Sequence, residues 1–90
     1  MNQEICLKKC YLRYEPEIDG GTMFLFNKED GTMLEGDYFS YMIIKELQKG
    51  NHLDEIKKSI SLDLELSTDE IRDGIEYVLN YLKSERFLTS

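Results

Sequence analysis

Residues 22–35 read TMFLFNKEDGTMLE and predict a β-hairpin. The first part, Thr22 to Phe26, is a short apolar and aromatic run typical of a central strand with both faces covered. The turn ends in Asp30-Gly31, a pair that tolerates the positive φ angles of tight hairpins. Residues 32–35 then form the returning strand, and Gly36 ends it. This hairpin supplies two strands of the predicted sheet.

A further strand is predicted before the hairpin. Residues 7–14 mix Tyr, Leu and Cys, which favour strands, with Lys and Arg, as in a half-exposed strand. Pro16 and the pair Gly20-Gly21 then interrupt the pattern and indicate a loop. The sheet is therefore expected to have three strands.

Three helices are predicted after the sheet, and each has start or stop signals. Asp37 suits the N-cap of a helix from Tyr38 to about Lys49, and Gly50 suits its left-handed C-terminal cap. Asn51 can cap a second, short helix with Leu53, Ile56 and Ile60 at helical spacing. Ser67 and Glu70 form a capping box for a third helix from Thr68 to about Glu85.

Between the second and third helices, residues 62–66 alternate strictly as LDLEL. This alternation allows a fourth strand, although a short extended connector is the simpler interpretation. We therefore predict an α+β domain covering residues 1–90, in which a three-stranded antiparallel sheet precedes three helices. This order has the outline of a winged helix-turn-helix.

The net charge does not suit DNA binding, the function that winged helices often have. The formal net charge is −7 and the pI is about 4.6. Binding to nucleic acid or to an anionic membrane surface needs cations, so both partners are disfavoured. Residues 67–86 carry three basic and five acidic side chains, which is unfavourable for a helix in a major groove.

The amino-terminal residues lack the pattern of a signal peptide, and no apolar stretch approaches the roughly 20 residues of a membrane span. We therefore expect a cytoplasmic protein.

His52 is the only histidine and has no nucleophile or carboxylate set around it, so a surface role is favoured over catalysis. Cys6 and Cys10 are an incomplete metal set and are interpreted as reduced, structural thiols. The sequence thus predicts no enzyme, no metal site and no cofactor.

The predicted third helix has two stripes. Five apolar residues at helical spacing form the core stripe: Ile71, Ile75, Val78, Leu79 and Leu82. Gly74, Tyr77 and Tyr81 form a second stripe on its flank. One interpretation is that the tyrosines widen the edge of the core; the other is that they wall a groove. A glycine inside a helix costs about 1 kcal/mol relative to alanine, so close approach of another backbone would explain Gly74.

The returning strand at residues 32–35 lies at a sheet edge if the strands follow chain order. It contains no proline and one charged residue, so little prevents another strand from pairing with it. An exposed edge beside an aromatic helix favours peptide binding by strand addition. The alternative is that the terminus of the chain itself covers this edge.

Four segments together resemble the PqqD-like proteins, the recognition elements for ribosomally made, post-translationally modified peptides. They are the run Met23–Glu35 followed by a helix, Lys49-Gly50, Leu53-Asp54-Glu55-Ile56, and the helix end from Leu79 to Leu88. The resemblance spans roughly Leu7 to Leu88 and rests on a diffuse pattern without a chemical signature. Asp37 stands where many relatives have Asn, and the regular 62–66 connector is a second departure.

The resemblance implies that the leader peptide of a precursor adds as a strand to the third strand, against the third helix. The domain would present the precursor to a separate modifying enzyme, such as a radical S-adenosylmethionine maturase, a cyclase or a leader peptidase. By position, the implied peptide-binding residues are Thr32, Met33, Leu34, Glu35, Ile71, Gly74, Tyr77, Val78 and Tyr81. Two other functions remain open at this stage: a winged-helix DNA-binding or regulatory protein, and a subunit that only docks on a larger enzyme.

Overall fold

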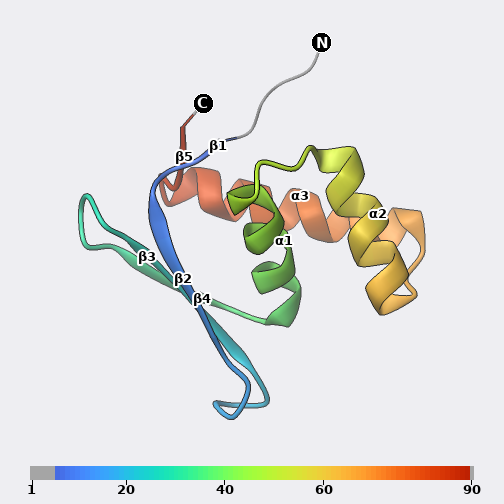
Figure 1. The fold of residues 1–90 in the computed structure, drawn as a ribbon, viewed down its shortest axis with the longest axis horizontal. Coiled ribbons are helices and arrows are strands. Elements are labelled where there is room, and N and C mark those ends of the chain that lie inside the picture. The colour runs from blue at the N-terminus through green and yellow to red at the C-terminus, as the bar shows by residue number, and fades with distance from the viewer. Residues whose placement is uncertain (1–5, 90) are drawn as a thin grey trace.

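A computed structural model describes residues 6–89 and places a small sheet beside three helices (Figure 1). The strands β2, β3 and β4 form an antiparallel sheet in that order, and the helices follow it in the chain. The predicted α+β fold is therefore confirmed. The elements are β1 (Cys6–Leu7), β2 (Cys10–Glu15), β3 (Thr22–Asn27), β4 (Met33–Gly36), α1 (Tyr38–Gln48), α2 (Leu53–Leu64), α3 (Thr68–Ser84) and β5 (Leu88–Thr89).

The β3–β4 hairpin forms as predicted, with one change at the start of β4. The Asn27 N–H donates to the Thr32 carbonyl at 2.8 Å, and Gly31 adopts a φ of +77° in the turn. The Thr32 N–H donates to Asp30 Oδ1 at 2.9 Å, so it is used inside the turn and the regular strand begins at Met33. Hydrogen bonds from the Thr32 side chain and backbone also hold the pKa of the Asp30 carboxyl below its ordinary value.

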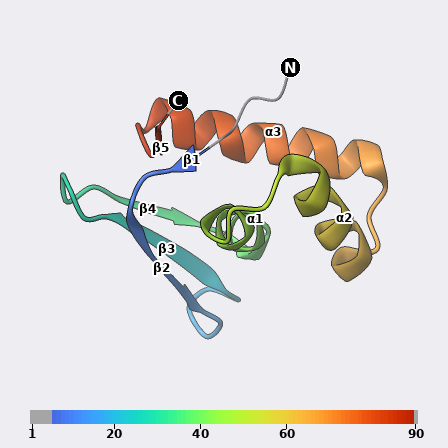
Figure 2. The same cartoon turned by 45° about the horizontal axis from the view of Figure 1, so that its top comes forward.

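One face of the sheet and all three helices enclose a single hydrophobic core. Alternate residues of β3 and β4 point toward the helices, because successive strand residues face opposite sides. Figure 2 shows α1 between the main sheet and α2, with α3 running above it. The buried core residues are Met23, Leu25, Leu34, Met42, Ile43, Ile44, Leu47, Ile56, Ile60, Ile71, Ile75, Val78, Leu82 and Phe87.

The predicted ends of α1 and α3 are close to the observed ones. Asp37 Oδ1 accepts a hydrogen bond from the Ser40 N–H at 2.9 Å, and Gly50 has a φ of +83° after α1. Ser67 Oγ accepts from the Glu70 N–H at 3.3 Å and donates to the Glu70 carboxylate at 3.0 Å. These side chains satisfy groups that a helix start leaves without intrahelical partners.

The second helix differs from the prediction at both ends. Its N-cap is His52 instead of Asn51, and Glu55 Oε1 accepts a hydrogen bond from the His52 N–H at 3.0 Å. Residues 62–64, predicted as an extended connector, belong to the helix, which ends where Glu65 turns to a φ of +54°. The reason is that Leu64 continues the four-residue spacing of Ile56 and Ile60 toward the core, whereas Leu62 is 81% exposed.

The predicted first strand is divided into β1 and β2. β1 leaves the main sheet and pairs antiparallel with β5, with Leu7 opposite Leu88 (Figure 1). The Lys8 N–H also donates to the Phe87 carbonyl at 2.9 Å. This two-stranded ladder pairs Leu7 with Leu88, which is 81 residues later in the chain (7 to 88). Such a pairing depends on long-range packing, and the local pattern of residues 7–14 does not reveal it.

Candidate functional site

The candidate site begins with the free side of β4. Within residues 6–89, β4 pairs with β3 alone, and the two terminal strands β1 and β5 pair with each other. The described ends of the chain therefore do not add a strand to β4. A strand with one unpaired side presents backbone donors and acceptors to any extended chain that approaches it.

The sheet register identifies the backbone groups that point outward. In an antiparallel ladder, residue pairs that exchange hydrogen bonds alternate with pairs that do not. The bond between Asn27 and Thr32 makes that pair a bonded one, and the register then makes Leu25–Leu34 the next bonded pair. It follows that Leu34 directs its N–H and C=O toward β3, whereas Met33 and Glu35 direct theirs away from the sheet.

The second part of the candidate site is the tyrosine face of α3, formed by Tyr77 and Tyr81. These side chains are 66% and 40% exposed, so they do not extend the buried core. Ile71 and Val78, which were assigned to the same site from the sequence, are buried in the core cluster. The two aliphatic residues therefore support α3 from inside, and the tyrosines are the members that a ligand can reach.

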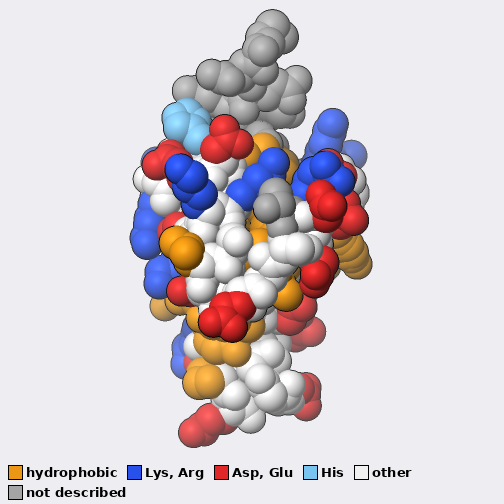
Figure 3. Space-filling model, turned by 90° about the vertical axis from the view of Figure 1, so that its right-hand side faces the viewer, with side chains coloured by type: hydrophobic (Ala, Val, Ile, Leu, Met, Phe, Trp, Pro, Cys, Tyr) orange, Lys and Arg blue, Asp and Glu red, His pale blue; other side chains and the backbone are white. Residues whose placement is uncertain are grey.

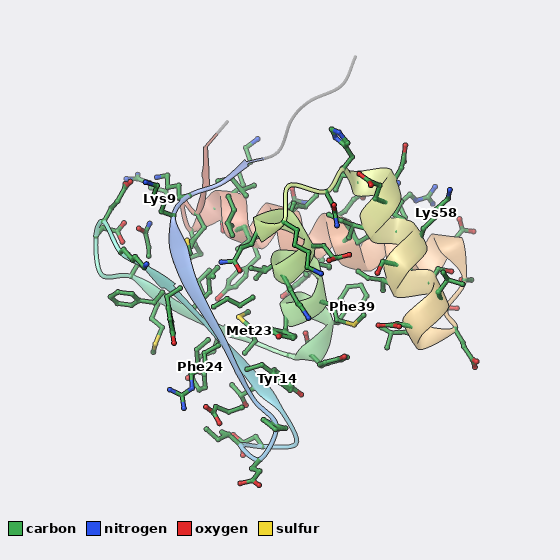
Figure 4. All side chains as sticks on the ribbon, viewed as in Figure 1. Lys9, Tyr14, Met23, Phe24, Phe39 and Lys58 are labelled. Atoms are coloured by element: carbon green, nitrogen blue, oxygen red, sulfur yellow. The ribbon has the colours of Figure 1, made fainter. Side chains whose placement is uncertain are left out.

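Gly74 accommodates an aromatic ring of the protein itself. A Cβ atom at this position would stand 2.7 Å from two ring carbons of Phe39. Phe39 is labelled in Figure 4, where it projects from α1 beside α3. Close packing between α1 and α3 thus supplies a structural reason for the glycine without any ligand.

We expect Gly74→Ala to lower the free energy of unfolding by about 1–2 kcal/mol, because overpacking against Phe39 outweighs the gain in helix propensity. In a Phe39→Ala background the added methyl group has room, so the same substitution should instead stabilise the domain by about 1 kcal/mol. Urea unfolding of the four proteins of this cycle measures both values. Equal effects in the two backgrounds would contradict the proposed contact.

α1 holds the two parts of the site together. It contacts both β4 and α3, and β4 runs directly into its N-cap, Asp37. Figure 2 shows β4 as the strand of the main sheet on the side of α3. Of the four predicted strand residues, Leu34 points into the core beside α1, Met33 and Glu35 are exposed, and Thr32 belongs to the turn. The open strand edge and the exposed tyrosines therefore lie on two elements that both contact α1.

The sheet has a second exposed feature on its side away from the helices. Figure 4 shows Met23 and Phe24, successive residues of β3, on opposite sides of the sheet. Phe26, on the outer side of β3, is 40% exposed, so the prediction that both faces of β3 are covered is wrong. A shallow hollow of about 560 Å³ lies on this outer face, and its lining is mainly apolar: Tyr11, Arg13, Glu15, Ile18, Phe24, Phe26 and Met33. Alternation within each strand could have indicated these residues, but only the register shows that they are neighbours.

Cys10 and the carboxylates of residues 6–89 form no separate metal site. Burial raises the pKa of the Cys10 thiol, and the nearby Asp30 and Glu29 raise it further, so the protonated thiol is favoured. Cys10 is not in a disulfide, and the side chain of Cys6 is outside the part of the chain that is described. In the same part, no three His, Cys, Asp or Glu side chains are grouped so that they could hold a metal ion.

In residues 6–89 there is no helix with the length and apolar character needed to cross a bilayer.

Comparison with known proteins identifies no relative of this chain. No family model, curated protein or solved structure matches the chain.

Proposed function

We propose that this domain is a PqqD-like recognition element that binds the leader peptide of a ribosomally synthesised precursor by β-strand addition to β4. The observation that carries the proposal is the outward direction of the Met33 and Glu35 backbone groups on a strand whose free side pairs with no described strand. A peptide strand can satisfy these groups with main-chain hydrogen bonds, and its alternate side chains can then contact the domain.

The tyrosine face of α3 supports the same proposal. An exposed tyrosine offers a ring for packing and a hydroxyl that stays in water, a combination that is enriched where proteins bind one another. A leader peptide that orders on binding loses about 2–5 kcal/mol of interaction energy, so a few such anchors must provide much of the affinity. In this proposal the domain itself is not catalytic, acts in the cytoplasm, and presents the precursor to a separate modifying enzyme.

The charge distribution gives no comparable support to DNA binding. On the end of the molecule seen in Figure 3, Lys and Arg side chains are interleaved with Asp and Glu and do not gather into one basic patch. On α3, Arg72 Nη2 lies 3.6 Å from Asp69 Oδ1, and Arg72 Nε lies 3.9 Å from Asp73 Oδ1. The guanidinium charge is therefore already shared with two carboxylates. A phosphate backbone would need such cations to be free.

The proposal is tested by titrating the domain with a fluorescently labelled leader peptide from a precursor encoded beside its gene. Saturable binding in an anisotropy assay is the expected result. A subunit that only docks on an enzyme would give no saturable signal, and a DNA-binding protein would bind a labelled duplex with an affinity that falls steeply with salt. Either outcome would overturn the proposal.

We expect Tyr81→Ala to weaken the peptide complex by about 1–2 kcal/mol while the domain stays folded, because an exposed anchor is lost without a cavity in the core. Asn80→Ala, at the neighbouring exposed position of α3, is the matched control and should leave the affinity unchanged. Circular dichroism verifies folding, and anisotropy gives the two dissociation constants. Equal affinities for the Tyr81 variant and the wild type would remove the tyrosine face from the site.

A further inference from the structure

We infer that the peptide bound at β4 carries an apolar residue opposite Met33 and a lysine or arginine opposite Glu35, two positions apart. This inference rests on the proposed function, since it needs a guest strand at the β4 edge. It concerns the outer face of the sheet, whereas the tyrosines of α3 lie on the helical side. The argument comes from the rows of side chains that cross the three strands.

The first row is apolar throughout. Tyr11 on β2 is opposite Phe26 on β3, and Phe26 is opposite Met33 on β4. All three side chains are exposed, with Met33 at 56%, and all three line the hollow on the outer face. A guest strand places its own residue next to Met33 in this row, at the Cβ–Cβ separation of about 5 Å at which opposite side chains interact. An apolar guest residue would cover Met33 and extend the row.

The second row ends in an unpaired negative charge. Arg13 is opposite Phe24, and Phe24 is opposite Glu35. Arg13 forms an ion pair with Glu15 on its own strand, and none of the ion pairs among the described residues includes Glu35. Because like charges opposite each other destabilise a sheet and opposite charges stabilise it, the guest residue facing Glu35 should be basic. The net charge of −7 favours the same sign.

The residue between these two lies on the helical side. Leu12, Leu25 and Leu34 form a row of inward-facing leucines, and the guest residue beside Leu34 continues that row. It leaves the outer face and points toward the layer that contains α3, because successive strand residues face opposite sides. The motif is therefore apolar–apolar–basic, written in either direction since the guest strand can run parallel or antiparallel to β4.

The test uses a display library of random linear 12-residue peptides, selected on immobilised wild-type domain. The expected result is enrichment of Lys or Arg two positions from an apolar residue. Selected peptides should bind Met33→Pro at least about tenfold more weakly than Met33→Ala, because both variants lose the methionine side chain but only proline also removes an outward N–H. Failure to select any peptide sensitive to Met33→Pro would overturn the proposed function, and this inference with it.

The charge pairing is tested separately with Glu35→Lys. Selection on this variant should enrich Asp or Glu at the same position, and a wild-type peptide with its basic residue changed to Glu should lose about fivefold in affinity for the wild type. Glu17→Lys makes the same change of net charge in the exposed loop before β3 and should not alter the selected motif. If peptides bind in a Met33→Pro-sensitive way but their charge preference does not invert, or inverts with Glu17→Lys too, strand addition stands and the Glu35 pairing is overturned.

Discussion

Met33→Pro should lower the affinity for the leader peptide by about tenfold or more relative to Met33→Ala, because proline removes an outward N–H and leaves a peptide carbonyl without its donor. The sheet itself should persist, since the Met33 N–H does not point toward β3 and proline is tolerated at strand edges. Isothermal titration calorimetry measures both affinities. Met33→Ala is the matched control because it truncates the same side chain and keeps the amide.

Leu34→Pro distinguishes the two directions of the ladder. The Leu34 amide belongs to the bonded Leu25–Leu34 pair and its side chain is buried, so proline there should cost about 3 kcal/mol or more in the free energy of unfolding. If Met33→Pro destabilised the domain as much as Leu34→Pro, the assignment of outward groups would be wrong. If Met33→Pro stayed folded and bound peptide like Met33→Ala, strand addition at β4 would be contradicted.

Phe87→Ala should lower the free energy of unfolding by about 3–5 kcal/mol, the usual range for removing a fully buried phenylalanine. Phe87 has no exposed surface, its N–H donates to the Leu82 carbonyl at 2.8 Å, and its carbonyl accepts from the Lys8 N–H at 2.9 Å. Arg86, with a φ of +63°, turns the chain so that this ring enters the core directly after α3. The residue therefore joins the end of α3 to the β1–β5 ladder.

Urea unfolding followed by circular dichroism measures the loss for Phe87→Ala. Leu62→Ala is the control, because it also shortens an apolar side chain but one that is largely exposed, and it should change stability by less than about 0.5 kcal/mol. A loss below about 1 kcal/mol for Phe87→Ala would mean that the ring does not anchor the core.

The elements predicted correctly are those with strong local chemistry. The Asp30-Gly31 turn, the caps at Asp37 and Ser67, and the left-handed Gly50 all follow from backbone conformations or hydrogen bonds within a few residues, and the structure has them at these positions. Residues 62–66 show the limit of such patterns. Leucines at every second position also contain a helical spacing, and contact between Leu64 and the core decided between the two.

The parts of the site that were not predicted depend on contacts between distant segments. Exposure of Tyr77 and Tyr81 follows from the way in which α3 packs, and the sequence left them between core and surface. The partner of Gly74 is Phe39, which is 35 residues earlier in the chain (39 to 74), so helix periodicity alone does not reveal it. The row Tyr11–Phe26–Met33 can likewise be recognised only when the register of the three strands is known.

The short ladder between β1 and β5 has a practical consequence for engineering. It brings Leu7 and Leu88 opposite each other, so both ends of the described chain leave the domain from one place (Figure 1). Neighbouring ends allow a domain to be inserted into a surface loop of a host protein without stretching either connection. A host enzyme could therefore carry this module as a loop insertion and keep the β4 edge available for its substrate.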